Sequence, residues 1–142
     1  METVYSWFFP LFGSQLAEHL YGWDEVTQGY TNINLFNYIG FWMFIITATV
    51  CLTYYYILNH PRWNRGLIWT LILASVAIIN FFIAFGICYY DLHNGYISSD
   101  LFVVNSDCIG FGFSNFIISG VCFFILSILI KWKSRNCKYT PF

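Results

Sequence analysis

Three long apolar runs dominate the pattern of hydrophobic and polar positions along the chain. Residues 26–61, 66–90 and 108–130 contain no Asp, Glu, Lys or Arg. Each run holds the roughly 20 apolar residues needed to cross about 30 Å of hydrocarbon. Lipid offers no partner for a free backbone N–H or C=O, so each run should be helical. We therefore expect an all-α membrane protein with three transmembrane helices, at about residues 35–58, 67–90 and 108–130.

A shorter amphipathic pattern precedes the first span, within residues 1–34. Phe8, Phe12, Leu16 and Leu20 recur at a spacing of four, which places them on one face of a helix. This apolar stretch is too short to cross a bilayer. It predicts an amphipathic helix lying flat on the outer leaflet or, alternatively, a re-entrant segment packed over a pore mouth.

Composition narrows the class of protein. Hydrophobic residues make up 58% of the 142 residues and charged residues only 9%, whereas a soluble domain carries about 25% charged residues. These values exclude a soluble globular enzyme, a disordered chain and a secreted disulfide-framework protein.

The few charges are sorted by sign. All 6 basic residues lie in the first loop, residues 59–66, or in the tail, residues 131–142. An odd number of spans puts this loop and this tail on one side of the membrane, and all 7 acidic residues then lie on the other side. Because Lys and Arg mark the cytoplasmic face, we expect the N-terminus outside and the C-terminus inside.

Polar residues within the spans are uncharged, which argues against a proton pump, a voltage sensor or a coupled ion transporter. Asn80 lies beside a seam of small residues in the second span, and Asn115 and Ser119 share a face of the third. One interpretation is close helix packing, in which each interhelical hydrogen bond contributes about 0.6 to 2 kcal/mol. The other is that these three residues line a water-filled path, which requires several copies of the chain because three helices alone cannot enclose an ion pore.

Motifs for catalysis or metal binding are missing, and we expect no enzyme, metal site or cofactor. The sequence holds no HxxxH, HExxH, CxxC or GxSxG spacing. Gly110 and Gly112 look like the start of a nucleotide-binding glycine motif, but they open a membrane span and should instead allow close packing there. Cys88 and Cys108 lie near the outer interface, where they form either a disulfide or two buried thiols.

The basic residues of the first loop and of the tail form the one cluster that could bind a ligand, and we call this cluster the basic inner face. In the first interpretation it sets topology and attracts anionic lipid, at about 1 kcal/mol per Lys or Arg. In the second, a symmetric oligomer repeats these charges around its axis and binds phosphates, while Trp63 and Trp132 stack on nucleobases. The candidate ligand-binding residues are Arg62, Arg65, Lys131, Lys133 and Arg135.

Three short segments, NHPRWNR (59–65), SDCIGFG (106–112) and KWKSRNCKYTPF (131–142), together with the three-span layout, resemble the small channel-type effectors of bacterial antiphage defence, of which the Hailong system is an example. The resemblance implies a channel in the bacterial inner membrane that a short DNA oligomer holds shut. A partner nucleotidyltransferase makes this oligomer, and infection releases the block. The basic inner face would then meet the phosphates of the DNA.

These observations lead us to expect a homo-oligomeric ion-conducting membrane effector, with a tetramer favoured, gated by an anionic nucleotide or oligonucleotide at its cytoplasmic face. Asn80, Asn115 and Ser119 are the candidate pore-lining residues. The alternative is a non-catalytic accessory subunit that anchors another membrane complex.

Overall fold

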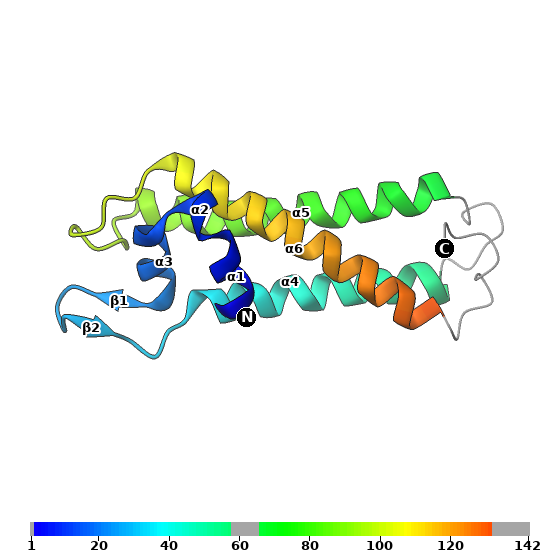
Figure 1. Cartoon of the computed structure of the whole chain (residues 1–142), viewed down its shortest axis with the longest axis horizontal. Helices are drawn as coiled ribbons and strands as arrows, with labels where there is room; N and C mark the ends of the chain where they lie inside the picture. The colour runs from blue at the N-terminus through cyan, green and yellow to red at the C-terminus, as the bar shows by residue number, and fades with distance from the viewer. Residues whose placement is uncertain (1, 58–65, 132–142) are drawn as a thin grey trace.

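Three long helices form the body of the molecule (Figure 1). The structure is a computed structural model that describes residues 2–57 and 66–131. Each long helix, taken with the π-helical turn η2 that extends the first, is long and apolar enough to cross a membrane. The predicted three spans are thus confirmed in length and composition. The elements are α4 (Leu35–Leu52), η2 (Thr53–Ile57), α5 (Gly66–His93) and α6 (Asn105–Lys131).

Two of the helices extend beyond the predicted apolar limits at the end that carries the acidic residues. Helix α5 continues to His93, and α6 begins at Asn105. At 1.5 Å per residue, the 28 residues of α5 cover about 42 Å, more than the hydrocarbon thickness. The hydropathy of the sequence predicts only the part of a helix that lies in lipid. Helix α5 itself continues until a glycine allows the chain to turn. Gly95 has φ +72° and lets the backbone N–H of Tyr96 bond back to the carbonyl of Asp91 at 3.0 Å.

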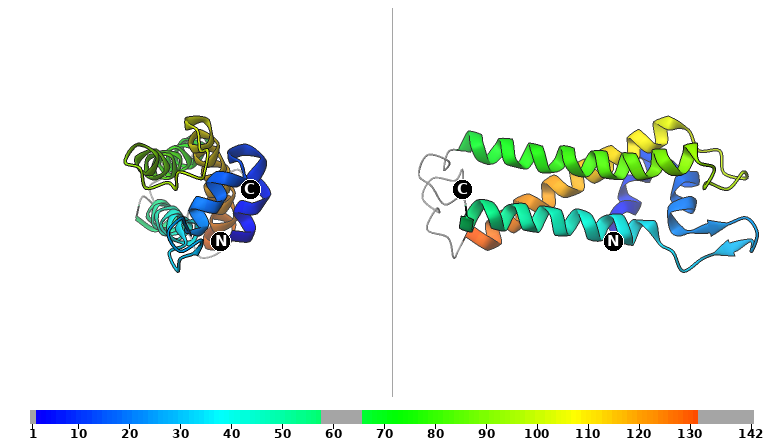
Figure 2. Two further views of the ribbon diagram at one scale, coloured as in Figure 1. Left: turned by 90° about the vertical axis from the view of Figure 1, so that its left-hand side faces the viewer. Right: turned by 180° about the vertical axis from the view of Figure 1, so that it is seen from behind.

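Helix α6 is the central element of the bundle. It crosses obliquely between α4 and α5 and packs along both (Figure 2). Its most extensive contact is with α5, and direct contact between α4 and α5 is slight. The position of α4 relative to α5 therefore depends on the side chains that α6 presents to each of them.

The N-terminal segment, residues 2–21, is made of four short pieces rather than one helix. They are α1 (Glu2–Tyr5), η1 (Ser6–Phe8), α2 (Phe9–Phe12) and α3 (Ser14–Tyr21). The break between α2 and α3 falls at Gly13, where φ is +77°, a conformation that favours glycine. The predicted apolar face persists across the break, because Phe12, Leu16 and Leu20 are all fully buried.

A short hairpin connects this segment to α4. Strand β1 (Trp23–Asp24) pairs antiparallel with β2 (Gly29–Tyr30). Two-residue strands are too short to show alternating hydrophobicity, so the sequence pattern did not indicate them. After the hairpin, Asn34 starts α4 by accepting a hydrogen bond from the backbone N–H of Asn37 at 3.1 Å.

The N-terminal segment and the three long helices share one core at the acidic end of the bundle. The rings of Tyr5, Phe36 and Phe111 meet there with centroids 5.2 to 5.9 Å apart. Cys88 of α5 and Cys108 of α6 form a disulfide within the same core. Of the two arrangements that the sequence left open for these cysteines, the structure contains the disulfide.

We predict that a C88S/C108S variant loses about 3 kcal/mol of stability, because the disulfide closes a loop with a sequence separation of 20. Thermal unfolding in detergent, with and without reductant, measures this loss. A variant that replaces the unpaired Cys51 and Cys122 by serine serves as the control and should remain sensitive to reductant. Recovery of Cys88 and Cys108 as free thiols from non-reduced protein would contradict the prediction.

Candidate functional site

A chain of buried hydrogen bonds, here called the polar chain, crosses the bundle. The Tyr5 hydroxyl donates to Asn115 Oδ1 at 2.7 Å, and Asn115 Nδ2 donates to the backbone carbonyl of Asn80 at 2.8 Å. Asn80 Nδ2 then donates to Thr47 Oγ1 at 3.3 Å, and Thr47 Oγ1 donates to the carbonyl of Met43 at 2.7 Å. The four side chains are 0% exposed. The polar chain thus joins the N-terminal segment to α6, α5 and α4.

The polar chain lies well inside the predicted hydrocarbon limits. Asn115 follows Cys108 by seven residues, about 10 Å along the helix, and Asn80 precedes Tyr90 by ten, about 15 Å. The burial of all four side chains shields these bonds from solvent, so a lost bond leaves a costly unpaired group.

Asn80 does not satisfy all of its polar atoms. Within the described part of the chain, its Oδ1 is buried and accepts no hydrogen bond. A buried acceptor without a partner costs about 1 to 3 kcal/mol. The hydrogen bond from Asn80 Nδ2 to Thr47, which joins α5 to α4, offsets part of this cost.

The structure brings two of the three candidate pore residues together. Asn80 and Asn115 are joined directly, whereas the Ser119 hydroxyl donates within its own helix, to the carbonyl of Phe116 at 3.0 Å. The interpretation as interhelical hydrogen bonding is confirmed for the two asparagines. All three side chains face the interior of the protomer, and their role along a water-filled path stays a prediction.

Sequence reasoning missed the two ends of the polar chain. Thr47 looks like any hydroxyl that bonds to its own helix, which it also does. Tyr5 belongs to a segment expected to lie on the surface of the outer leaflet or over a pore mouth, and no pattern indicated its partner. The only available signal was a phenol within an apolar stretch, since a buried tyrosine hydroxyl needs an acceptor.

Two glycines of α6 allow the N-terminal segment and α5 to approach closely. A Cβ at Gly110 would lie 2.7 Å from the carbonyl carbon of Leu11 and 3.3 Å from Phe12 Cα. A Cβ at Gly112 would lie 2.9 Å from the Phe81 ring. The expected close packing at the start of the third span is therefore confirmed, with the N-terminal segment as one of the two partners.

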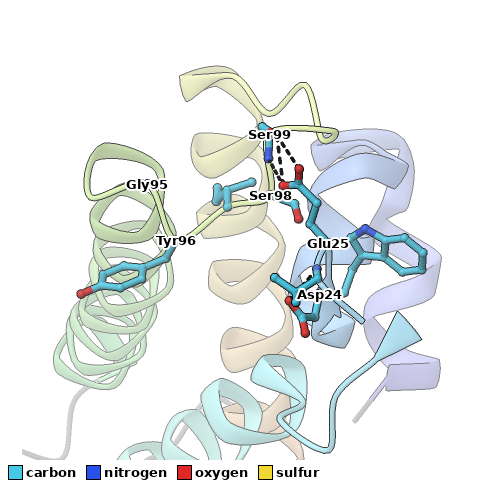
Figure 3. A pocket seen from close by; sticks show the side chains of 9 residues that line it. Asp24, Glu25, Gly95, Tyr96, Ser98 and Ser99 are labelled. Atoms are coloured by element: carbon cyan, nitrogen blue, oxygen red, sulfur yellow. Dashed lines mark hydrogen bonds between the residues drawn. The ribbon is translucent and has the colours of Figure 1, made fainter. Parts of the chain in front are cut away.

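Polar contacts outside the core also link the elements at the acidic end of the bundle. His19 Nε2 lies 3.3 Å from Asp91 Oδ2, which ties α3 to α5. The Glu25 carboxylate accepts from the backbone N–H of Ser99 at 3.1 Å and from its hydroxyl at 2.9 Å (Figure 3). Glu25 and Ser99 line an open hollow of about 480 Å³. Through its bonds to Ser99, the Glu25 carboxylate joins the loop of the hairpin to the segment between α5 and α6.

The basic inner face lies almost wholly outside the described residues. Arg62, Arg65, Lys133 and Arg135 belong to undescribed parts of the chain, and Lys131 is the last residue of α6. The ligand site predicted on these residues therefore stays a prediction. Within residues 2–57 and 66–131, no group of three His, Cys, Asp or Glu residues lies close enough together to hold a metal ion.

Comparison with protein-family models, with curated proteins and with solved structures gives no match for this chain. Its function must accordingly be inferred from its own residues.

We predict that Gly110→Ala releases the N-terminal segment from the bundle. The added methyl group would clash with the Leu11 backbone, which cannot move as a flexible side chain does. Hydrogen exchange of residues 2–21 should become about tenfold faster, equivalent to about 1.4 kcal/mol in local opening. Gly120→Ala on the same helix is the control, since its Cβ would meet only Leu73 Cδ2 at 4.0 Å. Equal exchange in both variants would contradict this prediction.

Proposed function

We propose that the chain is a homo-oligomeric ion-conducting membrane effector whose N-terminal segment closes the conducting path. The observation that carries the proposal is the hydrogen bond from Tyr5 to Asn115, about 10 Å inside the predicted hydrocarbon limit. Short, interrupted backbone is tolerated at such depth only where it is buried in protein or lines a water-filled cavity. Re-entrant segments of this kind are a feature of channels.

The orientation we propose, N-terminus outside and C-terminus inside, has two independent supports. All six basic residues fall in the sequence segments 59–66 and 131–142, which three spans place on the side opposite the seven acidic residues, as the positive-inside rule describes. The disulfide between Cys88 and Cys108 lies at the acidic end, and disulfides persist in oxidising compartments. Both features favour an outer location for the acidic end, and we propose that the membrane is a bacterial inner membrane.

Several copies must assemble to conduct, because one protomer fills its interior with side chains. Phe12, Phe111 and Phe123 are all 0% exposed, so a path for ions has to run between protomers or open by their movement. Closed cyclic symmetry is the common solution for identical chains, and we propose a tetramer. Its cytoplasmic basic face, with Arg62, Arg65 and their neighbours, would bind an anionic nucleotide or a short DNA made by a partner nucleotidyltransferase.

The channel proposal predicts current across a planar bilayer that contains the purified protein. Tyr5→Phe should raise the resting open probability about tenfold, because it removes the donor to Asn115 and leaves a buried acceptor unpaired. Tyr38→Phe is the matched control, since Tyr38 is 56% exposed on α4. Absence of conductance in all variants, with and without DNA, would refute the channel. Equal activity of the Tyr5 and Tyr38 variants would refute the closing role of the N-terminal segment.

The ligand proposal predicts that an R62A/K133A variant binds a short single-stranded DNA at least tenfold more weakly, with a smaller dependence on salt. The R62K/K133R variant keeps both charges and should bind nearly as well as the natural chain. Fluorescence anisotropy of labelled DNA at two salt concentrations measures both effects. Unchanged affinity in R62A/K133A would exclude the basic inner face as the binding site.

An accessory subunit that anchors another membrane complex is the second candidate. In its favour, hydroxyls of the described spans bond within their own helices, as Thr70 does to the Gly66 carbonyl and Ser75 to that of Leu71. The outward surface left by such bonding is apolar and suits the helices of a different chain as well as lipid. Native mass spectrometry of complexes extracted from membranes separates the candidates. An effector gives multiples of this chain, and an accessory subunit gives a fixed ratio to another.

A further inference from the structure

The disulfide between Cys88 and Cys108 is closed off from solvent. Both residues are 0% exposed, although they lie at the acidic end of the bundle, near the predicted limits of the hydrocarbon. A disulfide exchanges with a thiol only where a thiolate can reach one of its sulfur atoms. In the structure as it stands, no reductant has this access, so the elements that cover the disulfide decide when it can react.

The N-terminal segment covers the side of the disulfide that faces the middle of the bundle. Phe111 and Asn115 follow Cys108 by three and seven residues, so all three lie on one face of α6. The ring of Tyr5 lies 5.6 Å from that of Phe111, and its hydroxyl donates to Asn115. The ring of Phe12 lies 5.3 Å from that of Phe111, and α2 packs along α6 (Figure 1).

The same segment also contacts the bundle on the other side of the disulfide. Asp91 follows Cys88 by three residues, so it lies beside Cys88 on α5, one turn nearer the acidic loops. Its Oδ2 lies 3.3 Å from Nε2 of His19, which belongs to α3 and is only 7% exposed. The N-terminal segment thus holds on to α6 on one side of the disulfide and to α5 on the other.

The rest of the cover consists of long helices. The other buried members of the same core are Phe36, Ile39, Ala84 and Phe111, which belong to α4, α5 and α6. These helices cannot uncover the disulfide unless the bundle itself unfolds. The N-terminal segment consists of short helical elements ahead of the hairpin, and it can leave by a local opening that keeps the bundle intact.

We propose that the disulfide and the N-terminal segment form a redox-sensitive latch. A dithiol that approaches the acidic end reduces the bond between Cys88 and Cys108 only after the N-terminal segment has left the bundle. The reduced chain then holds this segment less firmly. The latch goes beyond the proposed channel function, since it does not require that the chain conduct ions.

The reaction is an ordinary thiol–disulfide exchange. One thiolate of the dithiol attacks a sulfur atom of the disulfide, forms a mixed disulfide with that cysteine and releases the other cysteine as a thiolate. The second thiolate of the dithiol then displaces the first cysteine and closes the reductant into its own disulfide. Two electrons pass from the dithiol to the protein, and the two protons that its thiols give up are taken by Cys88 and Cys108.

The coupling acts in both directions. The disulfide fixes the separation of α5 and α6 at the place where His19 contacts one helix and Tyr5 contacts the other. It therefore favours docking of the N-terminal segment. By linkage, the docked segment favours the disulfide by the same factor. Reduction and release of the segment accordingly promote each other.

The rate of reduction tests the shielding in the full-length chain. Cys51, Cys122 and Cys137 are first replaced by serine, which leaves only Cys88 and Cys108 as reporters. Dithiothreitol is added to the folded protein, free thiols are alkylated at intervals, and the mass of the intact protein gives the reduced fraction. Hydrogen exchange of residues 2–21 measures opening of the N-terminal segment in the same samples, and that of α5 measures unfolding of the bundle.

We expect Gly110→Ala and His19→Ala each to be reduced about tenfold faster, in step with faster exchange of residues 2–21. Gly120→Ala is the control for the first, because its Cβ would meet no atom closer than 4.0 Å. His93→Ala is the control for the second, because His93 is exposed and bonds to the Tyr89 carbonyl of its own helix. Equal reduction rates in all variants would overturn the inference, as would acceleration that follows only the exchange of α5.

The reverse direction is tested by replacing Cys88 and Cys108 by serine in the same background. Residues 2–21 should then exchange about tenfold faster relative to α5 than they do with the disulfide intact. An unchanged ratio would overturn the latch even where Gly110→Ala speeds reduction. None of these measurements uses a current, so failure of the latch and failure of the channel proposal remain distinguishable.

Discussion

The absence of hydrogen-bonding water in hydrocarbon is the constraint on which the structure depends. It makes the three spans helical, because only a helix satisfies its backbone within one segment. It also favours hydrogen bonds between buried polar side chains of different helices. Asn80 and Asn115 are joined at a depth where an unpaired amide is costly.

Helix α6 holds the N-terminal segment and the other two long helices together. Gly110 allows the N-terminal segment to pack closely, and Gly112 does the same for the Phe81 ring of α5. Asn115 is hydrogen-bonded to the N-terminal segment through Tyr5 and to α5 through the carbonyl of Asn80. Further along, the Ser127 hydroxyl accepts from Trp69 Nε1 at 3.3 Å and lies 3.8 Å from Cys51 Sγ. At Ser127, α6 therefore lies between polar groups of α4 and α5, while at Asn115 it joins α5 to the N-terminal segment. This arrangement accounts for the slight direct contact between α4 and α5.

The sequence predicts the spans well because their signal is local and strong. Uncharged runs of sufficient length have few alternatives in a membrane protein, and Asn80 and Asn115 stand out within them. The position of the N-terminal segment was not predictable in the same way. Its apolar face correctly indicates what Phe12, Leu16 and Leu20 bury, but not which surface covers them. The break at Gly13 and the pairing of Tyr5 with Asn115, 110 residues apart, depend on the packed helices and leave no periodic trace in the sequence.

Packing and gating need not be alternative roles for the buried asparagines. Asn115 bonds on one side to α5, through a carbonyl of a helix that stays in the membrane, and on the other to Tyr5, which belongs to a segment that does not span it. In the proposed channel, the first bond would hold α5 and α6 together in both states, whereas the second would be exchanged for water when the N-terminal segment moves. Loss of a buried bond costs about 1 to 3 kcal/mol, and 1.4 kcal/mol already changes a population tenfold. A ligand with a comparable difference in affinity for the two states is enough to shift such an equilibrium. On the proposed function, the bond between Tyr5 and Asn115 would thus be strong enough to keep the N-terminal segment docked and weak enough to allow its release.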